Sequence, residues 1–352
     1  MFIKEKRCKI RISYRRKKMK KVAINGLGRI GRLTLHHYVT IGSKDIEIVA
    51  ANDLTPNDEL AYLLRYDSVH GRALYPIDYG SDYISYRSKK IKILNEKDPA
   101  NLPWKAFGVD IVLECTGLFR KRQDAEKHLR AGASKVIISA PSDTADITIN
   151  LGVNEEYYNP MKHHIISNAS CTTNSLSPAI KVLDDAFGVE RLMVTTVHAY
   201  TASQALIDRS AKVKRRGRAA AVSIVPTTTG AAKATSLILP KLNGKMDAIA
   251  LRAPIPDGAI TDIVAEVKNN VTVKDINDTF RNAAMSKLQG ILSYTEDELV
   301  SSDIIGDLHS GTVDGTLTRV VDGKMVKVLV WYDNEAGYAK RLLELAEYIA
   351  KK

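Results

Sequence analysis

Three glycines near the start of the chain constrain its fold more than any other feature. Gly26, Gly28 and Gly31 follow the apolar, strand-like run Val22 to Asn25 and stand at the head of a helical pattern. The first glycine permits a tight turn, the second lets a pyrophosphate approach the backbone, and the third lets helix and strand pack closely. Asp53 ends the next strand-like run, 22 residues after Gly31, which is near the spacing of a carboxylate that binds ribose hydroxyls. The pattern predicts a dinucleotide-binding unit that favours NAD, because a carboxylate repels a 2′-phosphate.

Strand-like and helical patterns alternate from Lys20 to about Ser167. This alternation predicts an α/β fold with a doubly wound, mostly parallel sheet and right-handed crossovers. Residues 78–95 are expected to form antiparallel strands added to that sheet. The other predicted strands are Val22 to Asn25, Ile46 to Ala51, Asp110 to Cys115, Val136 to Ala140 and His164 to Ser167.

The pattern changes after Cys171. A helix from Thr172 to Phe187 precedes long strand candidates with few helices between them, which predicts an α+β domain with a mainly antiparallel sheet. The polar, basic loop from Ala202 to Pro226 is long enough to indicate a functional segment or an interface. An amphipathic helix is expected from Glu335 to Ala350. The strand candidates are Leu192 to His198, Asp247 to Pro254, Ile260 to Val267 and Met325 to Tyr332.

Length and charge limit the classes of function. A chain of 352 residues that is 45% hydrophobic and 26% charged suits two globular domains and excludes a disordered or fibrous protein. No apolar run approaches the ~20 residues of a membrane span, and we expect neither a secretory signal nor a membrane partner. Residues 1–18 carry +8 of the net charge of +12. This basic tail is either a solvated arm or a stretch upstream of the translated protein.

The cysteines indicate a nucleophile. Cys8, Cys115 and Cys171 are too few and too irregularly spaced for a disulfide framework or a zinc site, so we expect no metal and a reducing, cytoplasmic setting. Cys171 stands where an apolar strand gives way to a helix, whose positive N-terminal end is expected to lower the pKa of the thiol. His198, at the end of a predicted strand, is the expected base. Cys115 lies inside an apolar strand and is expected to be inert.

A cysteine nucleophile together with a dinucleotide site predicts aldehyde oxidation. Attack of the thiolate gives a thiohemiacetal, its hydride leaves for the nicotinamide, and the resulting thioester retains the acyl group. The segment from Thr227 to Lys233 offers hydroxyls and amides ahead of a small-residue helix, which suits an anion. Arginine side chains suited to phosphate complete the pattern and indicate phosphorylated substrates. These arginines are Arg215, Arg216, Arg218 and Arg252.

Several longer stretches show which family the chain resembles. They are NGLGRIGR at 25–32, YDSVHG at 66–71, SNASCTTN at 167–174, HAYT at 198–201, RRGRAAA at 215–221, TTGAAKA at 228–234 and WYDNEAGY at 331–338. Together they are similar to the phosphorylating glyceraldehyde-3-phosphate dehydrogenases, over about residues 20–348. The resemblance implies a homotetrameric enzyme that acts in glycolysis or gluconeogenesis. It implies conversion of D-glyceraldehyde 3-phosphate, inorganic phosphate and NAD into 1,3-bisphosphoglycerate and NADH through a cysteine thioester.

The resemblance also implies a role for each matching residue. Cys171 carries the acyl group and His198 acts as acid and base, with the loop 202–226 at a tetramer interface. The implied cofactor-binding residues are Gly26, Gly28, Arg29, Ile30, Gly31, Asp53, Lys97, Thr116, Ser139, Asn334 and Tyr338. The residues implied for the two phosphate sites are Ser170, Thr172, Thr201, Arg215, Thr229, Gly230 and Arg252. We expect an NAD-binding domain of residues 19–170 and 335–352 and a catalytic domain of residues 171–334.

Cofactor choice is less constrained than the chemistry. Lys97 stands where the family often has arginine, which alters a contact on the adenine side. Arg209 and Ser210 occupy positions where serine is typical of members that also accept NADP, whereas Asp53 favours NAD. NAD is therefore the expected cofactor, and NADP stays open as a second one.

Two alternative functions were weighed against this one. Erythrose-4-phosphate dehydrogenase shares the cysteine and histidine but departs in the phosphate-binding segments, which this chain retains as HAYT and TTGAAKA. The basic tail allows a side role in binding nucleic acid. No aromatic motif typical of RNA-binding proteins interrupts the basic run, so this role stays secondary.

Overall fold

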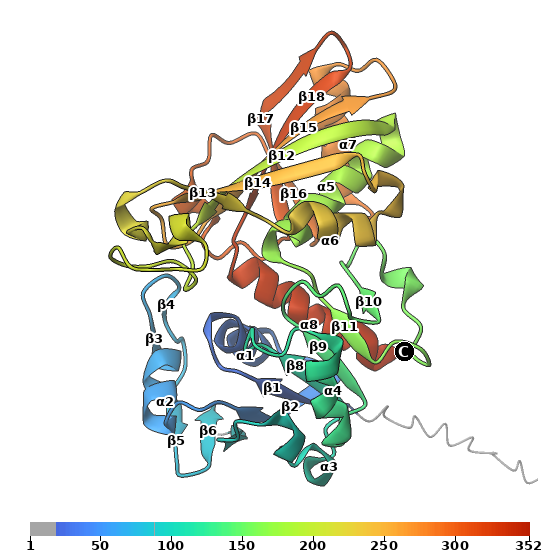
Figure 1. Cartoon of the computed structure of the whole chain (residues 1–352). Coiled ribbons are helices and arrows are strands. Elements are labelled where there is room, and N and C mark those ends of the chain that lie inside the picture. The colour runs from blue at the N-terminus through green and yellow to red at the C-terminus, as the bar shows by residue number, and fades with distance from the viewer. Residues whose placement is uncertain (1–18, 88) are drawn as a thin grey trace, which may run out of the picture.

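The computed structural model describes residues 19–87 and 89–352, so the predictions for the basic tail lie outside the described residues. Two large sheets organise the chain (Figure 1). The first has nine strands in the spatial order β10 (Ile147–Thr148), β11 (Ile165–Ser167), β9 (Lys135–Ile138), β8 (Ile111–Glu114), β1 (Lys20–Asn25), β2 (Ile46–Asn52), β7 (Lys89–Leu94), β6 (Tyr83–Tyr86) and β5 (Ile77–Tyr79).

This sheet confirms the predicted doubly wound arrangement. Pairing is parallel from β10 through β7, and β6 and β5 extend it in the antiparallel sense. The prediction for β7 was incomplete, because β7 is antiparallel to β6 but parallel to β2. Its side chains Ile91 and Ile93 are buried in the same core as Ile48 and Ala51 of β2, so the strand joins the main sheet.

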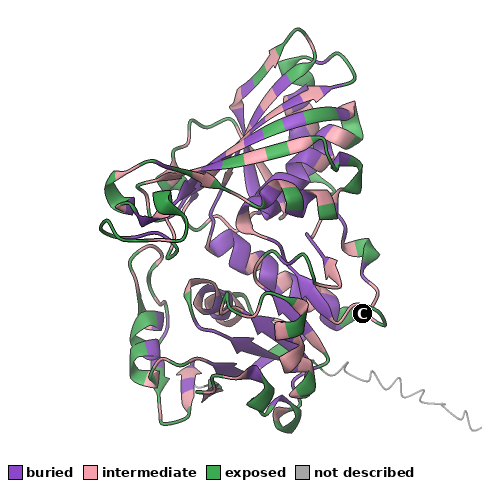
Figure 2. Cartoon of the chain, viewed as in Figure 1, coloured by how far each residue is buried: buried purple, intermediate pink, exposed green. Residues whose placement is uncertain are grey.

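Helices cover this sheet and connect its strands. The C-terminal helix α8 returns to it, packs beside α1 and buries Leu342, Leu345 and Ile349 in its core. Figure 2 shows α8 as one of the most buried helices of the molecule. The helices are α1 (Arg29–Ile41), α2 (Asn57–Arg65), α3 (Trp104–Phe107), α4 (Arg122–Arg130) and α8 (Ala336–Lys351), and a small hairpin of β3 (Tyr66–Asp67) and β4 (Gly71–Arg72) follows α2.

The second sheet has seven strands and carries the other half of the molecule. Its order is β13 (Val225–Thr228), β14 (Met246–Ala253), β12 (Val189–Ala199), β15 (Ala259–Val267), β18 (Met325–Tyr332), β17 (Gly311–Val321) and β16 (Leu292–Thr295). Pairing is antiparallel except between β12 and β14 and between β16 and β17, which confirms a mainly antiparallel sheet. Helices α5 (Cys171–Phe187), α6 (Ala231–Ile238) and α7 (Val273–Met285) pack with it.

The predicted elements of this half omit β13, β16, β17 and α7. Strand β17 contains two glycines and the buried polar residues Asp314 and Thr318, so it lacks a clear apolar alternation. Helix α7 begins with a capping box formed by Thr272 and Asp275, which was a readable start signal. The loop 202–226 contains short 3-10 turns rather than one continuous coil. The 3-10 turns of the chain are η1 (Pro99–Asn101), η2 (Glu155–Tyr157), η3 (Lys214–Gly217), η4 (Ala220–Val222), η5 (Pro240–Leu242) and η6 (Ser301–Ile304).

The two sheets meet where functional residues gather. Strands β1, β2 and β8 end at the edge of the parallel sheet that lines a cleft, and strand β11 leads through residues 168–170 into α5. Figure 1 shows α8 lying between the two halves. Ligands of open α/β sheets bind outside the carboxyl ends of the strands, so this edge is where the site is expected.

Candidate active site at the junction of the two sheets

The glycine loop forms one wall of a cleft of about 700 Å³. Gly26 has a φ of +94°, and a Cβ on it would lie 2.8 Å from the backbone nitrogen of Thr116. A Cβ on Gly31 would lie 2.0 Å from the carbonyl oxygen of Gly26, so neither position accepts a side chain. A Cβ on Gly28 would meet no atom within 4 Å. The loop is therefore closely packed at Gly26 and Gly31 but open at Gly28. Because Gly28 lies at the N-terminus of α1, the backbone there can approach an anion.

Five of the eleven cofactor residues expected from the sequence line this cleft. Gly26, Gly28, Asp53, Lys97 and Thr116 line it. The carboxylate of Asp53 accepts hydrogen bonds from the backbone nitrogens of Leu27 at 2.6 Å and of Thr55 at 2.9 Å. The carboxylate thus fixes the glycine loop while it lines the cleft.

Arg29, Ile30 and Ser139, which are also expected to bind the cofactor, belong to different elements. Arg29 and Ile30 open α1, and the Arg29 side chain bonds Glu335 and Asp67 rather than pointing to a ligand. A ligand therefore meets Arg29 through its backbone. Ser139 follows β9, where a hydrogen bond from its side chain acts on Cys115.

Asn334 and Tyr338 complete the cofactor side from the start of α8. The Asn334 side chain is 6% exposed and its Oδ1 has no hydrogen-bond partner among the described residues. A buried amide oxygen without a partner costs free energy, so it marks a place for a donor such as a carboxamide N–H. The Tyr338 hydroxyl donates to the carbonyl oxygen of Ala169 at 3.0 Å, which ties α8 to the loop before Cys171. These residues fit the nicotinamide end of NAD.

Cys171 is the first residue of α5. Ser170 caps the helix, since its Oγ accepts a hydrogen bond from the backbone nitrogen of Thr173 at 3.1 Å. Ala169 has a φ of +56°, a strained value for a residue with a side chain, and its burial holds it there. The sharp turn sets the half-buried thiol at the helix N-terminus, as the sequence predicts.

His198 reaches this thiol from the other sheet. It lies near the end of β12, and its Nε2 is 3.4 Å from the Sγ of Cys171. Its Nδ1 lies 2.7 Å from the carbonyl oxygen of Ala199. With the proton on Nδ1, this carbonyl is satisfied and Nε2 can accept the thiol proton, whereas the guanidinium of Arg252, which only donates, lies 2.6 Å from Nδ1 and favours the other tautomer. The structure therefore brings the two predicted catalytic residues into contact.

Strand register places Arg252 beside His198. Strands β12 and β14 run parallel, with His198 opposite Arg252. One guanidinium nitrogen of Arg252, Nη1, donates to the carbonyl oxygen of Ala199 at 2.9 Å and lies 2.6 Å from Nδ1 of His198. This pairing across strands puts a fixed positive charge within reach of the thiol and of a substrate.

Burial dominates the electrostatics of the pair. It raises the pKa of the Cys171 thiol to about 11, while the charge of Arg252 and hydrogen bonds from Thr172 act in the opposite direction. Burial, followed by the charge of Arg252, lowers the pKa of His198 to about 3. The sequence reading considered only the helix N-terminus and expected a lowered thiol pKa. Desolvation of the sulfur outweighs that effect, so the pair favours a thiol beside a neutral imidazole.

Tyr332 is a site residue that the sequence reading did not single out. Its hydroxyl lies 2.9 Å from Oγ1 of Thr172 and 2.8 Å from Oγ1 of Thr196, and its ring packs edge-on against His198. Tyr332 therefore links the start of α5 to β12 beneath the catalytic pair. The available signal was its place in the WYDNEAGY motif, two residues before Asn334.

The residues implied for the two phosphate sites are spread over several elements. Thr172 is buried in the Tyr332 network, whereas Ser170 and Thr201 are partly exposed, and the Thr201 Oγ1 lies 2.9 Å from the Oγ of Ser203. Thr229 and Gly230 precede α6, where the Thr229 Oγ1 accepts from the backbone nitrogen of Ala231 at 3.2 Å.

The two neighbouring arginines of η3 differ in their contacts with the segment before Thr229. Arg215 is exposed, whereas Arg216 donates to Thr227 Oγ1 at 3.0 Å and to the Thr228 carbonyl oxygen at 3.1 Å. The positive charge of Arg216 is also close enough to lower the pKa of Arg252. Two adjacent arginines are indistinguishable in sequence until the turn that orients them is known.

The surroundings of Cys115 support the expectation of an inert thiol. Burial, and then the negative charge of Glu114, raise its pKa to about 12. Among the described residues only a hydrogen bond from Ser139 opposes this shift, whereas the charge of Arg252 opposes the shift at Cys171. A second unpredicted group, His70 with Asp257 and Glu335, lies at the same junction and is described below.

Comparisons with known proteins agree with this geometry. The family model described as the NAD binding domain of glyceraldehyde 3-phosphate dehydrogenase matches residues 20–122, and the model of its C-terminal domain matches residues 170–334. The chain is 53% identical over 332 residues to glyceraldehyde-3-phosphate dehydrogenase of Geobacillus stearothermophilus, covering 94% of this chain and 98% of that protein. It is 51% identical over 332 residues to glyceraldehyde-3-phosphate dehydrogenase 1 of Bacillus subtilis, with the same coverage. Among the described residues, no helix has the length and apolar character to cross a membrane.

Proposed function

This chain belongs to the glyceraldehyde-3-phosphate dehydrogenase family, and on that premise we propose how its residues carry out the phosphorylating oxidation of D-glyceraldehyde 3-phosphate with NAD. The observation that carries the proposal is the Cys171 thiol, 3.4 Å from a histidine nitrogen and beside a fixed arginine charge. A nucleophile with an adjacent base is the requirement for covalent acyl transfer.

The first step uses the neutral pair of thiol and imidazole. The sulfur of Cys171 attacks the aldehyde carbon, and His198 takes the thiol proton at Nε2 and passes it to the carbonyl oxygen. The product is a thiohemiacetal on Cys171. His198 then removes the hydroxyl proton as the carbon is oxidised to a thioester. NAD, when bound, accepts the hydride of that carbon.

The second step transfers the acyl group. Inorganic phosphate attacks the thioester carbon and the Cys171 sulfur leaves, which releases 1,3-bisphosphoglycerate. The proton held by His198 returns to the sulfur, and the proton of the attacking hydrogen phosphate is released to solvent. We assign Thr201 and Arg252 to the substrate's own phosphate, and Ser170, Thr172, Thr229 and Gly230 to inorganic phosphate, with Arg216 in the place expected for Arg215.

The cofactor residues divide between two ends of the cleft. The open Gly28 at the N-terminus of α1 suits the pyrophosphate, and Asp53 and Lys97 lie on the adenosine side. Asn334 offers its unpartnered Oδ1 to the carboxamide. We infer NAD selectivity from Asp53, with NADP as the competing cofactor to be tested.

A kinetic assay tests the reaction. Reduced nicotinamide is followed with glyceraldehyde 3-phosphate and NAD, with and without inorganic phosphate, and with Cys171→Ser as the control. Steady turnover that requires phosphate and is lost in the variant is the expected result. Turnover without phosphate, or a higher kcat/KM with erythrose 4-phosphate, contradicts the assignment of Thr229 and Arg216. Parallel NADP assays decide cofactor preference.

We also propose how the chain divides into domains and how its subunits assemble. We assign residues 19–170 and 335–352 to NAD binding and residues 171–334 to catalysis.

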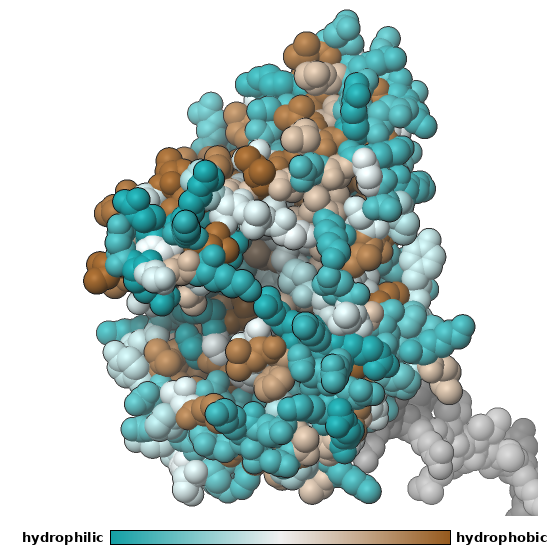
Figure 3. Space-filling view, in the orientation of Figure 1, coloured by the Kyte–Doolittle hydropathy of each residue, from teal (hydrophilic) through white to brown (hydrophobic). Residues whose placement is uncertain are grey.

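Five large hydrophobic residues of the loop 202–226 are exposed, and Figure 3 shows hydrophobic side chains gathered on this protruding loop. A homotetramer would cover them, and light scattering of the purified protein tests its mass. We propose a cytoplasmic location, because a reducing compartment keeps the thiol of Cys171 reactive. The exposed residues are Leu206, Ile207, Val213, Val222 and Ile224.

A further inference from the structure

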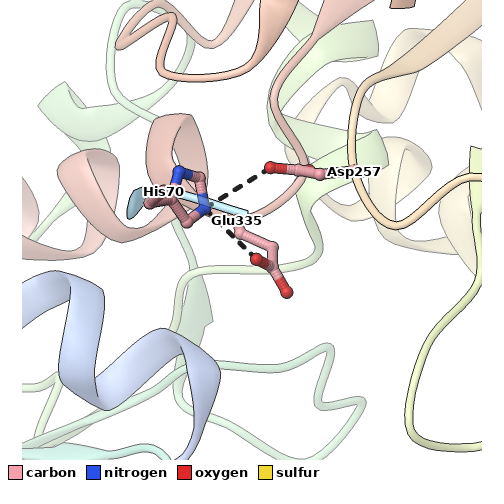
Figure 4. Close-up of side chains that lie close together, drawn as sticks. All are labelled: His70, Asp257 and Glu335. Atoms are coloured by element: carbon pink, nitrogen blue, oxygen red, sulfur yellow. Dashed lines mark hydrogen bonds and ion pairs between the residues drawn. The ribbon is translucent and has the colours of Figure 1, made fainter. Parts of the chain in front are cut away.

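A buried cluster joins the two halves of the molecule next to the cofactor site. His70 comes from the β3–β4 hairpin, Asp257 from the loop between β14 and β15, and Glu335 from the residues just before α8. Nε2 of His70 lies 3.2 Å from a carboxylate oxygen of Glu335 and 3.4 Å from Oδ2 of Asp257. Figure 4 shows both carboxylates facing this one nitrogen. Three segments that are far apart in sequence therefore converge on a single imidazole.

The cluster holds more acceptors than donors. One Nε2–H can serve only one carboxylate at full strength, and Oδ2 of Asp257 has no hydrogen-bond partner among the described residues. Asp257 itself is 1% exposed. Asp333 adds a third carboxylate close enough to raise the pKa of Asp257. A buried carboxylate in such a group is stable only if the cluster retains protons.

We infer that His70 and Asp257 are positioning residues for the cofactor: they fix the segment 333–335 across the junction and so hold Asn334 in place for the nicotinamide carboxamide. This inference rests on the proposed function, which assigns Asn334 to that group. The Asp333 carboxylate accepts hydrogen bonds from the backbone nitrogens of Glu335 and Ala336 at 2.8 and 2.7 Å. Asn334 lies between these anchored neighbours and cannot shift without them.

The protonation state of the cluster matters because its groups are coupled. Burial alone would lower the pKa of His70, but the hydrogen bond to Glu335 and the charges of Asp333 and Asp257 raise it. Burial, followed by the charges of Asp333 and Glu335, raises the pKa of Asp257 to about 8. The cluster therefore retains a proton at neutral pH and loses it as the pH rises through about 8.

Other charged groups face the cluster and set the sign of the effect. Arg29 binds Glu335 and Asp67, which leaves Asp257 and Asp333 without a guanidinium. The Asp257 charge also raises the pKa of Cys171, and that of Glu335 acts on His198. Loss of the proton adds a negative charge to carboxylates only a few ångströms apart. This added repulsion between neighbouring carboxylates is expected to loosen the junction and so to weaken NAD binding.

Calorimetric titration of the cofactor-free full chain with NAD tests this inference across pH 6.5–9.5. If binding requires the protonated cluster, the apparent Kd of the unchanged protein rises about tenfold from pH 7 to pH 9. Asp257→Asn keeps a neutral side chain of the same shape, so its Kd is expected to change less than about twofold over that range. His70→Gln is expected to raise the Kd at every pH. The exposed Asp297→Asn is the matched control and should follow the unchanged protein.

A second readout separates positioning from loss of fold. An acid whose folded pKa is raised destabilises the fold between its unfolded and folded pKa, so Asp257→Asn is expected to raise Tm more at pH 8 than at pH 5. At saturating NAD, kcat of His70→Gln should stay within about threefold of the unchanged protein while KM for NAD rises.

Three outcomes overturn the inference. The same pH dependence in Asp257→Asn would show that another group titrates. An unaltered Kd in His70→Gln would show that the cluster does not position Asn334. A stoichiometric divalent cation in metal analysis of the purified protein, lost in His70→Gln, would assign the cluster to a metal. Failure of the unchanged protein to bind NAD at any pH would instead contradict the proposed function itself.

Discussion

The two walls of the candidate active site, one on each sheet, are built from different atoms. On the parallel-sheet side, the glycine loop presents backbone: glycines without a Cβ, the N-terminus of α1, and amides held by Asp53. On the antiparallel side, the wall is side chains of neighbouring strands, with His198 and Arg252 paired across β12 and β14. A wall of backbone atoms tolerates substitution of nearby side chains but not a change in the path of the chain. A wall of side chains tolerates a small change in the path of the chain but not substitution of those side chains.

The two cysteines of the cleft illustrate the same difference. Cys115 lines the cofactor wall, where burial and Glu114 raise its pKa to about 12. Cys171 belongs to the catalytic wall, where His198 offers a base and Arg252 a positive charge. The same thiol group is therefore expected to be inert on one side and nucleophilic on the other.

The largest expected effect comes from the same substitution made on each side. Cys171→Ser should lower kcat by on the order of 10⁴-fold, because a serine hydroxyl beside a neutral imidazole is a poor nucleophile for this chemistry. Cys115→Ser should change kcat by less than about twofold. Steady-state assays measure both. A comparable loss in the two variants would remove the distinction between the walls.

The next effect concerns the arginines of the catalytic wall. Arg216→Leu should lower kcat/KM by about 10- to 150-fold, the equivalent of one lost charge-assisted hydrogen bond of about 1.5–3 kcal/mol. Arg215→Leu, one residue away on an exposed face, should cost less than about threefold. The dependence of rate on phosphate concentration is the measurement. An equal loss in both variants would favour general electrostatic attraction of phosphate over a defined contact.

The backbone wall is tested by two glycine substitutions. Gly28→Ala meets open space at a φ that alanine accepts, so the fold should be kept while the Kd for NAD rises about tenfold. Gly31→Ala places a Cβ 2.0 Å from the carbonyl oxygen of Gly26 and should lower stability by about 1–3 kcal/mol. Thermal melts and NAD titrations separate the two. Unchanged NAD affinity in Gly28→Ala would mean that the pyrophosphate does not approach this point.

The smallest effect is expected beneath the catalytic pair. Tyr332→Phe removes one partner of the buried hydroxyls of Thr172 and Thr196, the second of which still reaches the carbonyl oxygen of Ile260 at 3.4 Å, at a cost of about 1–3 kcal/mol in the free energy of unfolding. Its kcat should fall by less than about fivefold, since no proton passes through this hydroxyl. Tyr62→Phe, on an exposed ring, serves as the control. A loss of activity without a loss of stability would make Tyr332 a participant in the chemistry.

The backbone wall was largely predictable from the sequence. A turn that needs glycine leaves its mark at fixed local spacing, so Gly26, Gly28, Gly31 and Asp53 were all identified with the strand and helix that carry them. The same holds for Cys171, because the end of a strand and the start of a helix are adjacent in the chain.

The catalytic wall was predictable only in part. His198 was found from its place at a strand end, but its pairing with Arg252 depends on the register of two strands about 50 residues apart in sequence, which no local pattern specifies. Tyr332 and the His70 cluster depend on the same long-range packing, as do the contacts that distinguish Arg216 from Arg215. The pKa of Cys171 was misjudged for a related reason, because burial is a property of the folded molecule rather than of the segment.

A single-turnover experiment without inorganic phosphate tests the central claim most directly. The enzyme is mixed with NAD and excess glyceraldehyde 3-phosphate, reduced nicotinamide is recorded, and the intact protein and its peptides are weighed by mass spectrometry. The account predicts a burst of one equivalent per active site and an acyl group on the peptide that contains Cys171, released by added phosphate. An acyl group on another residue, or a burst with no covalent adduct, would contradict it.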